Sequence, residues 1–219
     1  MRVSFATDDS VKYVGHLDMA RAWARALRRA GLPLAYKGEF NPQPRIQFAA
    51  ALPVGTTGLS EIVDIYLLRT MNPPEFLDRL GPALPTGIRA TAGQLVPAEL
   101  PSLQSLVNAA HYRVDVETGE SPQAFQGRLD AFLIRREAWR ERRRGKEEAR
   151  YDLRPLVQSL HYTGPGEWGQ SFEAAMRAEP SATGRPDELL AELGYGTAPR
   201  QIVRLRLLFH ETETQPCAY

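Results

Sequence analysis

The first hundred residues combine short alternating segments with one long helical stretch. Residues 2–7 alternate between polar and apolar side chains, which is typical of a half-buried strand. A helix of about 14 residues is predicted next, because its apolar positions recur at helical spacing until Gly31 and Pro33 end it. Pro73 is predicted to open a second helix that runs through Leu80. Further strands are predicted at residues 34–37, 45–52, 60–69 and 87–95.

The second half repeats this order of elements. Residues 111–117 alternate as a strand, and Ser121 with Pro122 opens a helix that is predicted to run to about Arg136. Pro155 indicates an edge position or a bulge in the strand that contains it. A short helix is predicted from residue 184 to 193. Further strands are predicted at residues 139–144, 150–162, 171–178 and 201–209.

Each half therefore has the order strand, helix, two or more strands, helix, strand. This β-α-β-β-α-β order is that of the ferredoxin-like fold. We expect an α+β protein of two tandem ferredoxin-like domains, residues 1–98 and 109–209, followed by a flexible tail at 210–219. Right-handed crossovers would place both helices of each half on one face of its sheet. The other face would then be covered by the second half or left open for a ligand.

Composition excludes several classes of protein. The chain has 219 residues with 27 basic and 26 acidic side chains, and Cys217 is its one cysteine, which excludes a disulfide-built domain and an iron–sulfur cluster. The histidines lack metal-ligand spacing, and no glycine-rich nucleotide motif occurs. No apolar run approaches ~18 residues, and the first residues lack a signal-peptide core. We therefore expect a cytoplasmic protein with no membrane segment, no metal and no cofactor.

The basic residues are mostly arginines, and they are clustered. Arginine outnumbers lysine 24 to 3, and residues 135–154 hold nine basic against five acidic side chains. Arginine binds phosphate in a bidentate manner and stacks on bases, which favours an RNA partner. The near-neutral net charge of the chain leaves open the alternative that these arginines lie on ordinary solvent-exposed faces. The candidate nucleic-acid-binding residues are Arg21, Arg25, Arg28, Arg29, Arg45, Arg142, Arg144, Arg154 and Arg185.

Two further segments carry candidate chemistry. His16 lies at the predicted start of the first helix, two residues before Asp18, where it could transfer a proton to or from a phosphate ester. The alternative is a turn histidine beside an aspartate that caps the helix or favours its dipole. The loop at 38–45 is rigid enough to present Phe40, Asn41, Pro42 and Arg45 to a ligand, or it merely connects two strands.

Two acidic residues in the predicted strand at 60–69 complete the candidates. Glu61 and Asp64 fall on opposite faces of that strand, so a paired-carboxylate site is disfavoured. We expect both to be edge or solvent-facing charges.

Several motifs are spread along the chain: Tyr13-x-x-His16-Leu17-Asp18, Arg25-x-Leu27-Arg28-Arg29-Ala30-Gly31-Leu32-Pro33, Phe40-Asn41-Pro42-x-Pro44, Ala51-Leu52-Pro53-x-Gly55, Glu61 with Asp64, Asp152-Leu153-Arg154-Pro155-Leu156 and Arg185-Pro186-Asp187. Together they resemble one known family, the radical SAM-linked proteins. In that family an uncharacterised domain is encoded beside, or fused to, a B12-binding-type radical SAM protein. The resemblance covers about residues 2–209, but Gly15, Glu39 and Gln43 stand where serine, glycine and histidine are expected.

The resemblance implies partnership with a radical SAM protein and supplies no reaction. Combined with the arginine pattern, it predicts a non-catalytic adaptor that binds RNA, such as tRNA or rRNA, for that partner. One alternative is a module that docks on the radical SAM enzyme and touches only protein. The other is a metal-free RNA-processing endonuclease that uses His16. The oligomeric state and the identity of the RNA are not predicted.

Overall fold

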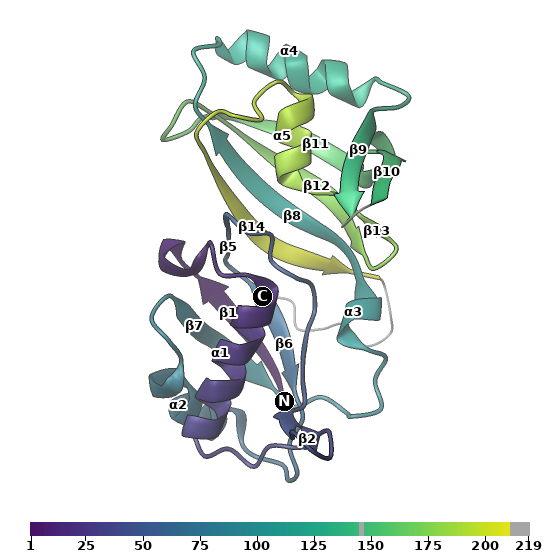
Figure 1. Cartoon of the computed structure of the whole chain (residues 1–219). Helices are drawn as coiled ribbons and strands as arrows, with labels where there is room; N and C mark the ends of the chain where they lie inside the picture. Colours follow the sequence, from purple (N-terminus) through teal and green to yellow (C-terminus); the bar gives the residue numbers. More distant parts are fainter. Residues whose placement is uncertain (145–146, 211–219) are drawn as a thin grey trace. The chain divides into compact units, whose positions relative to one another are not determined.

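The computed structural model describes residues 1–144 and 147–210 and has two compact units (Figure 1). The first unit comprises Met1–Val107 with Phe209 and His210, and the second comprises Asn108–Leu208. Both contain sheets and helices, so the prediction of a mixed α+β protein is confirmed. The predicted boundaries at 1–98 and 109–209 stay a prediction, and residues 211–219 of the predicted tail lie outside the described residues.

The first unit is built on an antiparallel sheet with the strand order β4-β6-β1-β7. Two helices, α1 (His16–Arg29) and α2 (Pro73–Leu80), share one apolar core with this sheet. The strands of the sheet are β1 (Arg2–Thr7), β4 (Ile46–Phe48), β6 (Glu61–Ile65) and β7 (Ile88–Gln94). Smaller elements are β2 (Tyr36–Lys37), β3 (Gln43–Pro44), β5 (Thr56–Gly58), α3 (Leu103–Leu106) and the 3-10 turns η1 (Asp9–Val11) and η2 (Gly81–Ala83).

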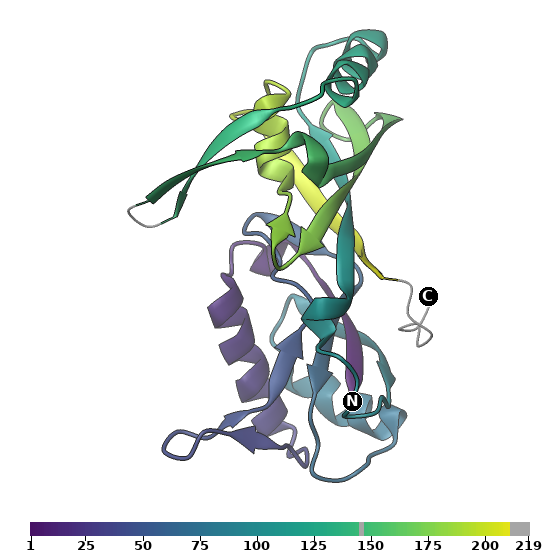
Figure 2. The same ribbon diagram turned by 90° about the vertical axis from the view of Figure 1, so that its right-hand side faces the viewer.

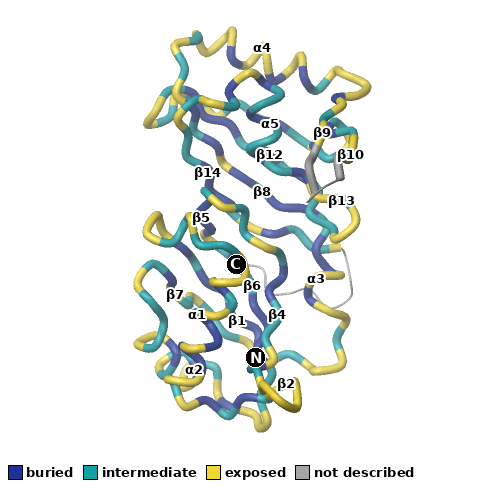
Figure 3. Tube along the Cα trace, viewed as in Figure 1, coloured by how far each residue is buried: buried dark blue, intermediate teal, exposed yellow. Residues whose placement is uncertain are grey.

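The core of this unit is centred on Trp23 of α1. Its side chain is fully buried and meets Phe5 edge-on at 4.9 Å and Phe48 at 6.1 Å between ring centroids. Burial of one such side chain stabilises the fold by about 1.5–3 kcal/mol. Helix α1 ends as predicted, because Gly31 adopts a φ of 61° that other residues disfavour. Buried and exposed positions alternate along α1 (Figure 3), and its four arginines are exposed.

The second unit repeats this arrangement. Its main sheet has the order β11-β12-β8-β14, in which the first strand is again internal and β13 (Ala182–Thr183) pairs with β12. Its elements are β8 (Val107–Val116), α4 (Pro122–Leu133), β11 (Val157–Pro165), β12 (Gln170–Glu179), α5 (Pro186–Glu192) and β14 (Arg200–Phe209). In both units the elements follow the predicted β-α-β-β-α-β order. Assignment of the pair as tandem ferredoxin-like domains stays a prediction.

Several predicted strands are shorter than expected. The predicted strand at 150–162 is wrong, because β10 (Glu147–Asp152) ends before the 3-10 turn η3 (Arg154–Leu156) and β11 begins after it. The Asp152 carboxylate explains the break, since it accepts hydrogen bonds from the Ala138 and Arg154 amides at 2.7 and 3.0 Å. Strand β10 pairs instead with β9 (Trp139–Arg144) in a separate two-stranded ribbon. The strand at 60–69 likewise ends at Ile65.

The expectation that Glu61 and Asp64 face solvent is wrong. Glu61 is 3% exposed and Asp64 is 9% exposed. Arg2 lies directly opposite Asp64 on the neighbouring strand and is also buried. Its Nε and Nη2 donate to the two carboxylate oxygens at 2.8 and 2.9 Å. The alternation along one strand could not reveal this pair, because the partner lies on a strand about sixty residues earlier in the chain.

We expect Asp64→Ala to lower the free energy of unfolding by about 3 kcal/mol, because it leaves the Arg2 guanidinium buried without its counter-charge. Urea denaturation measures this loss. The matched control is Asp9→Ala, which removes the more exposed ion pair between Lys12 and Asp9 and should cost less than about 1 kcal/mol. Equal losses in the two variants would contradict the importance of the buried pair.

Candidate nucleic-acid interface

An open cleft of about 910 Å³ lies within the first unit. Helix α1, the β2–β3 hairpin, β4 and the segment 98–104 line it. Its basic and titratable side chains are His16, Arg21, Lys37 and Arg45, and none of its lining residues, all of them described, is acidic. The lining of the cleft is therefore basic and favours an anionic ligand, although Arg21 is paired with Asp18 beside the cleft.

The start of α1 places His16 at this cleft and Asp18 just beside it. His16 is the first residue of the helix, and its exposed ring meets Phe48 edge-on at 5.4 Å. Gly15 is the N-cap residue, so Asp18 does not cap the helix and instead lies in its first turn. There its carboxylate forms an exposed ion pair with Arg21 at 2.9 Å. Within the described part of the chain, no hydrogen bond joins His16 to a second titratable side chain.

The β2–β3 hairpin forms another wall and projects from the body of the first unit (Figure 2). Its tip, residues 38–42, exposes Phe40, Asn41 and Pro42. Gly38 permits the tight tip, because it has a φ of 90° and a Cβ there would lie 3.3 Å from the Asn41 carbonyl oxygen.

The hairpin is attached to α1 by hydrogen bonds. Arg28 donates to the Pro42 carbonyl oxygen at 3.2 Å and to Gln43 Oε1 at 3.0 Å. Gln43 in turn donates from Nε2 to Asn41 Oδ1 at 2.9 Å. Gln43, which stands where the family resemblance leads us to expect histidine, therefore relays the contact from the helix to the hairpin tip.

Arg45 follows the hairpin and is held by stacking. Its guanidinium lies 3.8 Å from the centroid of the Tyr66 ring, an arrangement that orders the side chain while its edge stays exposed. Main-chain hydrogen bonds fix both residues, because the Arg45 amide donates to Ala35 at 2.8 Å and the Tyr66 amide donates to Arg45 at 3.0 Å. An arginine held this way offers its donors to a ligand with little loss of freedom.

The other arginines predicted on α1 do not line the cleft. Arg25 and Arg28 are exposed on the helix, and Arg28 braces the hairpin. Arg29 donates to the carbonyl oxygen of Ala83 in η2. Of the four arginines predicted to bind nucleic acid from this helix, Arg21 therefore lies at the cleft and the other three lie elsewhere on the same unit.

In the second unit, two of the predicted arginines have partners within the fold. Arg154 donates to the carbonyl oxygens of Leu133 at 2.8 Å and Val157 at 2.9 Å, and so ties the end of α4 to β11. Arg185 pairs in a bidentate manner with Asp187 at 3.0 and 2.9 Å. Burial opposes the charge of Arg185, but Asp187 outweighs it and the pKa of Arg185 is raised. The side chains of Arg142 and Arg144 lie outside the described residues.

Basic side chains of the second unit also have carboxylate partners. Arg128 forms an ion pair with Glu120, which accepts a further hydrogen bond from the Tyr195 hydroxyl at 2.9 Å. The hydrogen bond from Arg128 holds the pKa of Glu120 below its ordinary value. In a groove of about 340 Å³ between α4 and α5, Glu192 pairs with Arg135 at 2.6 Å. The sequence did not reveal these pairs, in which carboxylates of the same unit compensate the charge of Arg128 and Arg135.

A family model matches residues 1–186, and its description is "Uncharacterized protein conserved in bacteria (DUF2344)". The chain belongs to this family. The match includes every residue of the cleft and ends at the first residue of α5. Among the curated proteins, none matches this DUF2344 chain in sequence.

Solved structures to which this chain is similar include three complexes, each with a TM-score below 0.5. A Cbf5-Nop10-Gar1 complex matches with a TM-score of 0.49 and 10% identity over 85% of this chain and 44% of that one. An archaeal box H/ACA sRNP Nop10-Cbf5 complex matches with a TM-score of 0.45 and 10% identity. The match covers 93% of this chain and 47% of that one. An H/ACA RNP bound to a substrate RNA matches with a TM-score of 0.46 and 9% identity, and it covers the same shares of the two chains. The DUF2344 chain thus spans less than half the length of these chains.

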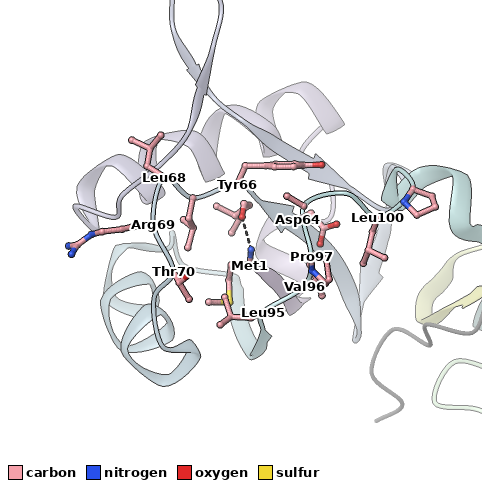
Figure 4. A pocket seen from close by; sticks show the side chains of 14 residues that line it. Met1, Asp64, Tyr66, Leu68, Arg69, Thr70, Leu95, Val96, Pro97 and Leu100 are labelled. Atoms are coloured by element: carbon pink, nitrogen blue, oxygen red, sulfur yellow. Dashed lines mark hydrogen bonds between the residues drawn. The ribbon is translucent and has the colours of Figure 1, made fainter.

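A second cavity of the first unit, about 330 Å³, is lined by a mixture of polar and apolar groups (Figure 4). The Asp64 carboxylate at its wall is held by Arg2, and the Met1 nitrogen donates to Ile65 at 2.8 Å. The Arg69 side chain points away from its centre (Figure 4). The described residues include no cluster of three metal-ligating side chains and no helix that is long and apolar enough to cross a membrane.

We expect Arg28→Ala to loosen the β2–β3 hairpin without unfolding the unit, because the hairpin loses its two hydrogen bonds to α1. Hydrogen exchange at the amides of residues 37–43 should become faster, with a stability loss of about 0.5–1.5 kcal/mol. Arg25→Ala, one turn earlier on the same exposed face, is the control and should leave these amides unchanged. If both variants exchange at the rate of the unsubstituted chain, Arg28 does not hold the hairpin.

Proposed function

We propose that this chain is a non-catalytic adaptor that binds RNA through the cleft of its first unit on behalf of a radical SAM partner. The observation that carries the proposal is the meeting of Arg21, Lys37 and Arg45 in one cleft without an acidic lining residue. These cations come from α1, from β2 and from the residue between β3 and β4, so no single periodic pattern explains why they gather. We also propose that the two units are tandem ferredoxin-like domains.

The chemistry of the cleft suits a phosphate backbone with bases attached. Lys37 and Arg45 supply charge for phosphate oxygens, and the amides of Asn41 and Gln43 supply donors and acceptors beside them. Arg45 is already ordered against Tyr66, so contact with a phosphate or a base edge costs little side-chain entropy. RNA is recognised mainly by such a combination of backbone charge, stacking and hydrogen bonding.

The radical SAM partner enters the proposal through the family resemblance. An iron–sulfur cluster is held by several thiolates, and this sequence contributes one cysteine, so the cluster would belong to the partner. In this proposal the DUF2344 chain binds and presents the RNA while the partner carries out the reaction.

We expect a fluorescently labelled tRNA to bind at about 50 mM salt and to bind far more weakly at about 200 mM, because counterions are released from each phosphate that is contacted. Arg45→Ala should weaken binding and reduce the slope of log Kd against log salt by about one. Arg89→Ala removes an exposed arginine on β7 outside the cleft and is the matched control. Fluorescence anisotropy measures both quantities.

Two results would contradict this assignment. One is an absence of tRNA binding by the unsubstituted chain at low salt. The other is an equal loss for Arg45→Ala and Arg89→Ala, which would show that binding depends on total charge and not on the cleft. Co-purification with a radical SAM enzyme together with no RNA binding would favour the docking module that touches only protein.

The position of His16 in the same cleft favours one second candidate, an RNA-processing endonuclease. Its imidazole is exposed beside Arg21 and Arg45, where it could reach a bound phosphate ester. An endonuclease usually needs a second positioned acid or base, and His16 has no hydrogen-bonded titratable partner within the described residues. This makes the adaptor the better-supported function.

We accordingly expect end-labelled tRNA to stay intact during prolonged incubation with the unsubstituted chain, as judged on a denaturing gel. His16→Ala should bind the same tRNA with an affinity within about twofold of the unsubstituted chain, since Lys37 and Arg45 still supply the cationic contacts to the phosphate backbone. Cleavage by the unsubstituted chain that disappears in His16→Ala would replace the adaptor with a nuclease.

A further inference from the structure

The tip of the β2–β3 hairpin carries an aromatic side chain that contributes nothing to the core. Phe40 is 101% exposed, the highest value among the exposed large hydrophobic residues that the structure describes. A phenylalanine in this position packs against no other side chain, so the stability of the fold does not account for it. The tip is nevertheless a built structure, because Gly38 sets its turn and Arg28 holds its base from α1.

The surroundings of Phe40 are polar and mainly basic. Lys37, Asn41 and Gln43 belong to the same hairpin and line the cleft, and Arg45 follows directly. Glu39 is the acidic residue of the tip and is exposed, so it repels phosphate on its own side. A bound phosphate backbone would therefore follow Lys37 and Arg45, which leaves the Phe40 ring free to meet a base.

We infer that Phe40 is a stacking platform for an unpaired nucleobase, and that the cleft thereby selects looped or single-stranded RNA over duplex. This inference rests on the proposed function and deepens it. Both faces of a base inside a duplex are covered by its neighbours, so an aromatic side chain at a hairpin tip can stack only on a base that lies outside the helix.

The same features argue against a lipid surface as the occupant. An interfacial membrane anchor needs a continuous apolar face, often with a second signal. Here the apolar surface is the single ring of Phe40. Its neighbours in the hairpin are the carboxylate of Glu39 and the amides of Asn41 and Gln43, and the two strands have only two residues each. A base needs one aromatic face with polar groups at its edge, and this is what the hairpin tip provides.

The experiment uses an RNA hairpin with 2-aminopurine in its loop and a second RNA with 2-aminopurine inside a continuous duplex. Stacking against an aromatic ring quenches the fluorescence of this base. We expect the unsubstituted chain to quench the loop probe and not the duplex probe. Phe40→Ala should abolish the quenching and weaken binding of the loop RNA about tenfold, with the duplex affinity and the salt slope unchanged.

Two further variants make the test specific. Phe40→Trp keeps an aromatic face and should retain both the quenching and the preference for the loop. Leu68→Ala removes another exposed apolar side chain of the first unit, 76% exposed and at the mouth of the other cavity, and should behave like the unsubstituted chain.

The outcomes separate this inference from the function on which it rests. If the unsubstituted chain binds both RNAs with a clear salt slope but Phe40→Ala loses nothing on the loop RNA, the stacking platform is overturned and the RNA-binding cleft stands. If neither RNA binds at low salt, both are overturned. If Phe40→Ala loses affinity for vesicles of anionic phospholipid while quenching of the RNA probe is unaffected, the hairpin is a membrane contact and the inference is overturned.

Discussion

The packing of α1 against its sheet through Trp23 is the contact on which the arrangement of the first unit depends. Trp23 lies between Phe5 of β1 and Phe48 of β4, and Phe48 also meets the ring of His16. This aromatic cluster fixes both the rotation of the helix about its axis and the position of β4 beside it. As a result, Arg21 from the helix and Arg45, which directly precedes β4, lie at the same cleft.

Arginines are held in place in two different ways in this protein, by carboxylates and by an aromatic ring. In the second unit, Arg128, Arg135 and Arg185 each face a carboxylate, which neutralises them and holds them in place. At the cleft of the first unit, Arg45 is ordered by an aromatic ring, which holds the guanidinium and leaves its charge intact. Clusters of arginine in a sequence are therefore a poor guide to a binding surface until their partners are known.

Much of the architecture could be predicted from the sequence, because it rests on local patterns. The periodicity of α1 and its stop at Gly31, and the proline that opens α2, are signals carried by neighbouring residues. The ends of the strands were harder to predict, because they depend on where each strand stops forming hydrogen bonds with its neighbour in the sheet. The break at Pro155 depends on the Asp152 carboxylate, which accepts from the amide of Ala138 well before it in the chain.

The candidate site could be predicted only in part, for the same reason. The sequence indicated that Arg21, Arg45 and the loop around Phe40 could serve a ligand, but not that Lys37 joins them or that Arg154 is tied to backbone carbonyl oxygens. Spacing along a helix shows which side chains share a face, and it does not show which other element lies opposite that face. The cleft is the product of such long-range neighbours.

The choice of glutamine at position 43 has a consequence for how the hairpin behaves in acid. The amide oxygen of Gln43 accepts from Arg28, and an amide keeps the same acceptor between pH 5 and pH 8. An imidazole at this position, as the family resemblance leads us to expect, would become a cation as the medium turned acidic, and a cation repels a guanidinium. The side chain that receives the hydrogen bond from α1 is therefore an amide, whose hydrogen bonding does not depend on acidity in this range.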